Sequence, residues 1–214
     1  MKKVLSAILI LCVLLGSFSA CTTTNNGYKA GTITDNKYES AYLNLGFNLP
    51  EGHSFADEAA RKDFENGMKK QMKEADEKTK GSAVLCEMIS ENEDKSERII
   101  VTLEKKTDEQ MATTKEVLQE TTYNKLYAEY EKLYETYLML DVPDTETNIG
   151  ALFAHDVIAT TDESETGYVV RRIITLDHAS YYISITLAAN TNERMSELTD
   201  QLYRLVEVNT EAAE

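Results

Sequence analysis

The sequence predicts an α+β protein, a single α/β/α sandwich with a mainly antiparallel sheet and helices on both faces. The chain has 214 residues, 42% of them hydrophobic, and only two prolines, which suits one domain with a substantial core. Strand-like and helix-like segments alternate along it, and consecutive strands joined by short turns have to be antiparallel. Apolar residues also occupy both faces of the strand that begins at Ile149, so we expect helices to cover both sides of the sheet.

The first half of this domain is bounded by clear turn and capping signals. Pro50-Glu51-Gly52 ends an alternating apolar segment, and Ser54 followed by Asp57 resembles a helix N-cap. Beyond that cap, apolar residues recur at helical spacing as far as Gly81. We therefore expect a strand or hairpin over 38–49, a helix over 56–78, and two strands over 83–89 and 98–103 joined by a polar loop.

The second half begins with a capping box formed by Thr107 and Gln110. The helix that it opens is expected to continue to about Leu140, with Thr121-Thr122 as the point where it weakens or divides. Three strands over 149–160, 168–176 and 181–188 follow. Asn190 is the expected N-cap of the last helix, whose buried face would carry Met195, Leu198, Leu202 and Leu205.

The segment over 42–55, YLNLGFNLPEGHSF, resembles the opening of the PsbP-like and Mog-type α/β/α sandwich domains. In those domains a strand reading Gly-Phe-x-x-Pro ends near an aromatic residue. The similarity is greatest to small lipoproteins of Gram-positive bacteria, and the order of elements extends it loosely over 32–208. His53 stands where the family usually has Trp, so the resemblance implies a packing role there. It implies the fold but no particular function, because this fold serves many functions.

The N-terminus carries the pattern of an export signal. Lys2 and Lys3 precede an apolar run of roughly a dozen residues, shorter than the about twenty that a spanning helix needs. The small residues that follow end at Cys21, an arrangement that resembles the lipobox of bacterial lipoproteins. We expect a signal peptide over 1–20, a lipidated Cys21 with a flexible tether over 21–31, and the domain over 32–210. An ordinary cleaved secretory signal is the alternative.

The charge balance restricts the partners of the chain. With 37 acidic and 22 basic residues, the formal charge of −15 argues against binding to nucleic acid, which depends on Lys and Arg. The same charge disfavours anionic lipid surfaces, so attachment to a membrane is expected through the lipid on Cys21. Cys86 then has no partner for a disulfide within the domain, and its apolar surroundings predict a buried side chain.

No constellation of side chains in the sequence predicts catalysis, a metal or a cofactor. His53, His155 and His178 are far apart in the sequence, and none lies at a metal-ligand spacing from a cysteine. His155 and Asp156 are neighbours on a strand and therefore point to opposite faces. The acidic clusters over 91–94 and 162–165 fall in predicted hairpin loops and lack the calcium-loop pattern.

The most unusual feature is a row of tyrosines within the long predicted helix. Their spacing of four and three residues aligns them along one side of a helix, next to a row of leucines. One interpretation is that the leucines face the sheet while the tyrosines cover its rim with their hydroxyls in water. Another is that the tyrosines form one wall of a groove for a peptide, a sugar or a partner protein, and a third is a coiled-coil partner helix. The candidate groove residues are Tyr123, Tyr127, Tyr130, Tyr134 and Tyr137.

Together these patterns predict a membrane-anchored lipoprotein on the extracytoplasmic face of the cell membrane. Its domain is expected to bind a ligand or protein, or to support an envelope assembly, without catalysis. A solute-binding component of a transport system is one alternative, although such proteins normally need two lobes. An unrecognised hydrolase is the other, and it requires a histidine, Asp156 and a serine to converge.

Overall fold

The structure is a computed structural model that describes residues 28–75, 84–133, 136–142, 149–150, 152–160, 169–178 and 180–206. The predicted signal peptide over 1–20, Cys21 and Tyr134 lie outside the described residues. Within them the chain forms two sheets, and every strand pairing is antiparallel. The predicted mixture of helices with antiparallel strands is therefore confirmed.

The larger sheet has the strand order β4-β5-β6-β10-β9-β8-β7, and the smaller sheet has the order β1-β2-β3-β11. The larger sheet comprises β4 (His53–Phe55), β5 (Val84–Asn92), β6 (Arg98–Lys105), β7 (Thr136–Val142), β8 (Phe153–Thr160), β9 (Val169–His178) and β10 (Tyr181–Ala189). The smaller comprises β1 (Thr32–Ile33), β2 (Lys37–Ser40), β3 (Leu45–Asn48) and β11 (Leu202–Tyr203). The described helices are α2 (Glu58–Ala75), α3 (Asp108–Ala112), α4 (Lys115–Leu133) and α5 (Asn192–Asp200).

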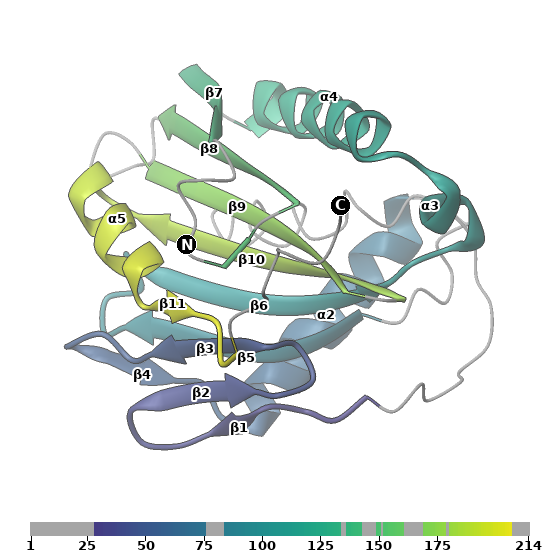
Figure 1. Cartoon of the computed structure of the whole chain (residues 1–214). Helices are drawn as coiled ribbons and strands as arrows, with labels where there is room; N and C mark the ends of the chain where they lie inside the picture. Colours follow the sequence, from purple (N-terminus) through teal and green to yellow (C-terminus); the bar gives the residue numbers. More distant parts are fainter. Residues whose placement is uncertain are drawn as a thin grey trace.

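Different elements cover the two faces of the larger sheet (Figure 1). On one face α2 packs against β5, and α4 packs against β7 and β8. On the other face lie α5 and the smaller sheet, joined to the larger sheet by the main apolar cluster, which includes Phe47, Ile185 and Met195. This second layer thus contains a small sheet as well as a helix, an addition that the sequence prediction did not include.

The main core follows from the alternation of side chains along the central strands. On β6 and β10 every second residue is a buried Ile, Val or Leu that faces α5 and the smaller sheet. The smaller sheet contributes Tyr38, Leu45 and Phe47, all fully buried. The Gly-Phe segment of the predicted first strand is β3, and Phe47 lies opposite Leu202 of β11. The last described strand, β11, therefore pairs with β3 from the start of the domain in one sheet.

The long helix predicted from Thr107 to about Leu140 is wrong in two places. It divides at Thr113, whose extended backbone closes α3, and not at Thr121-Thr122. It also ends at Leu133, after which the chain forms the strand β7. The capping box of Thr107 and Gln110 is confirmed, with both reciprocal hydrogen bonds present. Pairing with β8 along seven residues outweighs the helical spacing of apolar residues beyond Leu133.

The last helix also differs from its prediction. Its N-cap is Thr191 and not Asn190, because the Thr191 hydroxyl accepts the Arg194 N–H at 3.2 Å. Met195 and Leu198 are buried as expected, but Leu202 belongs to β11 and not to the helix. Among the helices that the structure describes, none is both long enough and apolar enough to cross a bilayer.

Candidate functional site

Three of the five candidate tyrosines surround a cavity between α4 and β7. The cavity has a volume of about 420 Å³. Tyr123 and Tyr127 reach it from α4 and Tyr137 from β7, so the tyrosines converge from two elements and not from one helix. It is lined by Tyr123, Tyr127, Glu131, Thr136, Tyr137, Leu138 and Met139, which we call the tyrosine groove.

Tyr130 does not line the tyrosine groove as predicted. Tyr130 is 1% exposed and packs with Leu126, Met139 and Val157 beneath α4. Its hydroxyl accepts a hydrogen bond from Arg171 Nη1 at 3.3 Å, so this ring belongs to the core between α4 and β9. Tyr134 lies outside the described residues. The row therefore divides into groove tyrosines and a core tyrosine.

Ring contacts fix the shape of the groove wall. The rings of Tyr127 and Tyr137 meet edge to face, with centroids 5.4 Å apart and planes at 74°. Partial burial and the neighbouring Tyr127 raise the pKa of Tyr137 to about 12, so its hydroxyl stays protonated at neutral pH. Tyr127 remains 47% exposed. The wall is thus an aromatic surface that also carries phenol hydroxyls, suited to planar and polar groups alike.

The tyrosine groove adjoins the edge of the larger sheet. β7 pairs only with β8 among the described strands, so its outer backbone edge has no neighbouring strand there. Leu138 and Leu140 on this strand are 54% and 44% exposed, and with Tyr127 they account for half of the exposed large hydrophobic residues described. Such an edge is open to pairing with another extended chain.

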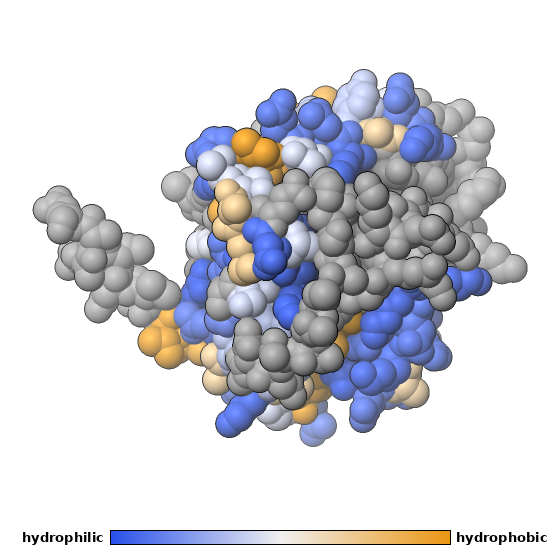
Figure 2. Space-filling view, turned by 90° about the vertical axis from the view of Figure 1, so that its right-hand side faces the viewer, coloured by the Kyte–Doolittle hydropathy of each residue, from blue (hydrophilic) through white to orange (hydrophobic). Residues whose placement is uncertain are grey.

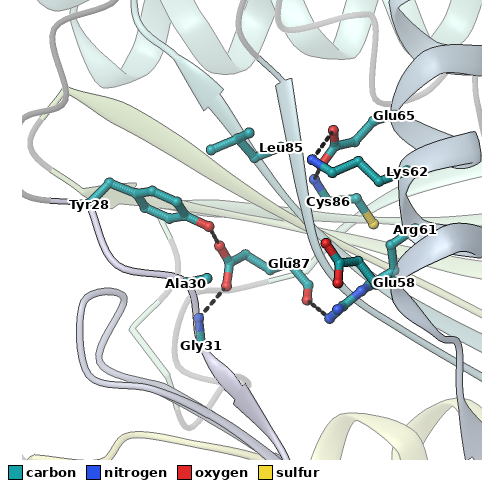
Figure 3. A pocket seen from close by; sticks show the side chains of 10 residues that line it. All are labelled: Tyr28, Ala30, Gly31, Glu58, Arg61, Lys62, Glu65, Leu85, Cys86 and Glu87. Atoms are coloured by element: carbon teal, nitrogen blue, oxygen red, sulfur yellow. Dashed lines mark hydrogen bonds and ion pairs between the residues drawn. The ribbon is translucent and has the colours of Figure 1, made fainter.

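A second cavity, of about 370 Å³, lies between the start of the described chain, α2 and β5 (Figure 3). Glu87 lies at its centre. The pairing of β5 with β6 shifts register between Cys86 and Met88, which makes Glu87 the extra residue of a β-bulge. The bulge turns its carboxylate toward the N-terminal segment over 28–31.

The Glu87 carboxylate accepts three hydrogen bonds, two from that segment and one from β2. Its carboxylate accepts hydrogen bonds from the hydroxyl of Tyr28, from the Gly31 N–H at 2.9 Å and from the Tyr38 hydroxyl at 2.9 Å. Burial raises the pKa of Glu87, and the Gly31 N–H opposes that shift. The sequence assigned residues 28–31 to a flexible tether, but the structure holds Tyr28 and Gly31 against the domain.

On its helical side, this second cavity is closed by paired groups of α2. Arg61 Nη1 donates to the Glu87 carbonyl at 2.9 Å, and Glu65 accepts the Cys86 N–H at 3.0 Å. Lys62 and Lys69 approach Glu65 at 3.3 and 3.6 Å. Sequence reasoning missed Glu87, although a single acid inside the apolar run over 83–89 was a signal of it. These contacts hold α2 against β5, and the Glu87 carboxylate binds the N-terminal segment on the other side of the cavity.

The three histidines occupy separate places. His53 is buried and contacts Ser90 at 3.2 Å and Glu97 at 3.1 Å, while Arg194 binds the same Glu97. This network ties β4 to α5 and agrees with a packing role. His155 lies beneath the ring of Tyr123, with 5.9 Å between ring centroids, and His178 packs on Tyr42 at 4.8 Å.

The residues required by the hydrolase alternative point to different faces. Asp156 forms a two-point ion pair with Arg172, with both oxygens 2.7 Å from guanidinium nitrogens. His155 faces α4 instead. The described part of the chain also contains no group of three or more His, Cys, Asp and Glu side chains placed to hold a metal ion.

Comparison with known proteins gives only distant likenesses. No family model matches the sequence, and no curated protein is similar to it. The solution structure of cyanobacterial PsbP (CyanoP) from Synechocystis sp. PCC 6803 is similar at 10% identity and a TM-score of 0.40, covering 86% of this chain and 98% of that one. A crystal structure from Bacteroides thetaiotaomicron VPI-5482 is similar at 9% identity and a TM-score of 0.38, covering 82% of this chain and 50% of that one.

Both TM-scores lie below 0.5, so neither likeness establishes a common fold, ligand or activity. The class that the structure itself defines is a mixed α/β domain with two antiparallel sheets. Whether this domain is PsbP-like stays a prediction.

Proposed function

We propose that the protein is a membrane-anchored extracytoplasmic lipoprotein whose domain binds a partner protein through the tyrosine groove, without catalysis. The observation that carries the proposal is the convergence of Tyr123, Tyr127 and Tyr137 on one cavity beside an open sheet edge. Tyrosine gives a large contact area at a low cost in side-chain entropy, and for that reason it is enriched at binding surfaces.

The partner segment is extended and carries basic residues. An extended chain can pair with the outer edge of β7, which places its side chains beside the tyrosine groove and the exposed Leu138 and Leu140. Glu131 at the groove and the net charge of −15 favour a segment with Lys or Arg. The surface shown in Figure 2 is mainly hydrophilic where it is coloured, with only small separate hydrophobic patches.

The anchor is tested by replacing Cys21 with Ser. The variant is expected to move from the membrane fraction to the soluble fraction or the medium, because one sulfur atom carries the lipid. Retention of the Cys21→Ser protein in the membrane fraction would refute lipidation at this position.

The groove is tested by photo-crosslinking on intact cells. A photoreactive amino acid at position 138 is expected to yield one dominant crosslinked protein, and Tyr127→Ala is expected to lower that yield at least fivefold, because about 1 kcal/mol or more of contact is lost. Position 117 is the matched control, since Val117 is 52% exposed and Leu138 is 54% exposed. Equal yields at positions 117 and 138 would contradict the proposal, and circular dichroism shows whether Tyr127→Ala remains folded.

A further inference from the structure

The N-terminal segment over 28–31 is held against the domain before the chain reaches its first strand. The Tyr28 hydroxyl and the Gly31 N–H both donate to the Glu87 carboxylate. Glu87 is only 4% exposed, so water competes little for these two hydrogen bonds. Among the described residues, the point from which the chain continues toward Cys21 is therefore Tyr28, ahead of β1.

This attachment limits how far the domain can stand from a lipid on Cys21. Seven peptide units join Cys21 to Tyr28, and at about 3.6 Å per residue they span at most about 25 Å, whatever conformation they take. If residues 28–31 were released, eleven units would join Cys21 to Thr32 of β1, and the limit would rise to about 40 Å. We call the chain between Cys21 and the first residue held by the domain the leash, and the contacts of Glu87 shorten it.

The tyrosine groove lies diagonally across the larger sheet from this attachment. The strand register places the residue next to Glu87 on β5 level with Ala154 of β8, whereas Leu138 of the groove pairs with Ile158. Five strand intervals of about 4.8 Å and a shift of four residues along β8 therefore separate Glu87 from Leu138, a distance of about 27 Å. In Figure 1, β1 lies at the bottom of the view and β7 at the top.

A second route through the structure gives a similar distance. The ring of Tyr28 contacts the ring of Tyr42, which in turn lies 4.8 Å from the ring of His178 at the end of β9. Val170 of β9 is level with Leu138 across β8. Eight residues along β9 and two strand intervals then separate His178 from Leu138, a distance of about 28 Å. The groove is thus slightly farther from Tyr28 than the fully extended leash is long.

A leash of this length does not allow the groove to face the membrane. With the groove against the bilayer, Tyr28 would lie about 27 Å above it, and the leash would also have to pass around the side of the domain. That distance exceeds the limit of about 25 Å that holds while Glu87 binds the segment. It lies well within the limit of about 40 Å that applies once the segment is released.

We propose that the contacts of Glu87 keep the tyrosine groove turned away from the membrane that carries Cys21. The partner segment then reaches the groove from the side opposite the bilayer. An extended basic segment of a soluble protein, or of a domain that stands away from the bilayer, fits this position, whereas a segment lying on the bilayer does not. This inference rests on the proposed lipidation of Cys21 and on the proposed role of the groove.

The test measures energy transfer from two positions of the domain to a bilayer. The mature lipidated protein is placed in phosphatidylcholine vesicles that contain acceptor-labelled lipid, with a fluorescent amino acid at position 41 or at position 138. Ala41 is exposed next to Tyr42 on the side of Tyr28, and Leu138 is exposed at the groove. Position 138 is expected to lie about 20 Å or more farther from the acceptors than position 41. Equal distances for the two positions overturn the proposal.

Two variants lengthen the leash in different ways. Glu87→Ala releases the segment over 28–31, and insertion of Gly-Ser-Gly-Ser between Thr24 and Asn25 adds the same number of residues without touching the described domain. In both variants the difference in distance is expected to fall by about half or more, because the domain can then turn over. Glu58→Ala is the control and should match the wild type, since Glu58 lines the same cavity without a described hydrogen bond to the segment. A difference that the insertion leaves unchanged overturns the proposal, even if Glu87→Ala does not fold.

The same experiment separates this inference from the proposed function. Protein that does not float with the vesicles has no lipid, and that result refutes the anchor at Cys21 and the inference with it. The vesicles contain no partner, so the measured distances do not depend on what the groove binds. Equal distances in protein that does float therefore refute the orientation alone.

Discussion

At the scale of single residues, Gly46 shows why the Gly-Phe segment of β3 has a glycine. The ring of Tyr203 from β11 lies where a Cβ on residue 46 would be, only 2.3 to 2.4 Å from two ring carbons. The Tyr203 hydroxyl donates to Glu39 of β2 at 3.0 Å, which fixes the ring in this position. The glycine therefore allows the last described strand to close over the first hairpin.

Gly46→Ala is expected to destabilise the domain by about 1 to 3 kcal/mol, because the Tyr203 ring has to move and lose its bond to Glu39. Urea denaturation measures the change. In a Tyr203→Ala background the same substitution should cost much less, since the ring that clashes is gone. Equal costs in both backgrounds would contradict this explanation.

Glu87 is a second residue whose role depends on its neighbours. Glu87→Ala leaves the donors of Tyr28, Gly31 and Tyr38 without their acceptor, and Tyr38 is fully buried. We expect a loss of about 2 to 4 kcal/mol and a release of the N-terminal segment. Limited trypsin digestion followed by mass spectrometry should show faster cleavage after Lys29. Glu58→Ala is the control, because Glu58 lines the same cavity without a hydrogen bond to the segment among the described contacts, and its cleavage rate should match the wild type.

At the scale of elements, the strands and helices with strong local signals could be predicted from the sequence. The hairpin of β5 and β6, the helix α2, the capping box of α3 and the strand β10 each follow from periodicity or from a cap within the element. The strand over residues 136–140 could not be predicted, because the tyrosine and leucines there continue a helical spacing. Pairing with β8, the next strand along the chain, makes this segment a strand.

The same reasoning applies to the candidate site. The sequence identified the groove tyrosines, but it placed all five on one helix face. It could not show that Tyr137 faces Tyr127 across two elements, or that Tyr130 is buried against Arg171. The position of Glu87 depends on a β-bulge, and this feature has no local sequence pattern.

The capping box gives a prediction at this scale. Thr107→Ala removes both the Thr107 acceptor for the Gln110 N–H, at 3.1 Å, and the reciprocal geometry of the box, so it should cost about 1 kcal/mol. Thr114→Ala at the start of α4 is the comparison, because its bond to the Val117 N–H is 3.5 Å long and contributes less. Chemical denaturation that ranks Thr114→Ala above Thr107→Ala would refute this assignment of caps.

At the scale of the whole molecule, the buried acids give the stability of the domain two opposing dependences on pH. Arg194 holds the pKa of Glu97 below its usual range, so the stability from that pair is present above pH 4.5 and is lost on acidification. Burial raises the pKa of Glu104 to about 8, against the opposing effect of Lys125. A carboxyl group whose pKa is raised by folding contributes most to the stability of the folded state below its unfolded pKa of 4.5. For Glu104 that contribution is lost as the pH rises toward 8.

Between pH 5 and pH 8 the Glu104 contribution should therefore fall with rising pH, by an amount on the order of a few kcal/mol at about 1.4 kcal/mol per pKa unit. Glu87 acts in the same direction, because burial also raises its pKa, while the lowered pKa of His178 acts in the opposite direction. Urea denaturation at pH 5.0, 6.5 and 8.0 measures the combined effect of these groups on the free energy of unfolding. Glu104→Gln isolates the effect of Glu104, because glutamine does not ionise. The variant should lose less stability than the wild type across this range. Parallel curves for the two proteins would mean that the Glu104 carboxyl ionises in the folded domain as it does in the unfolded chain.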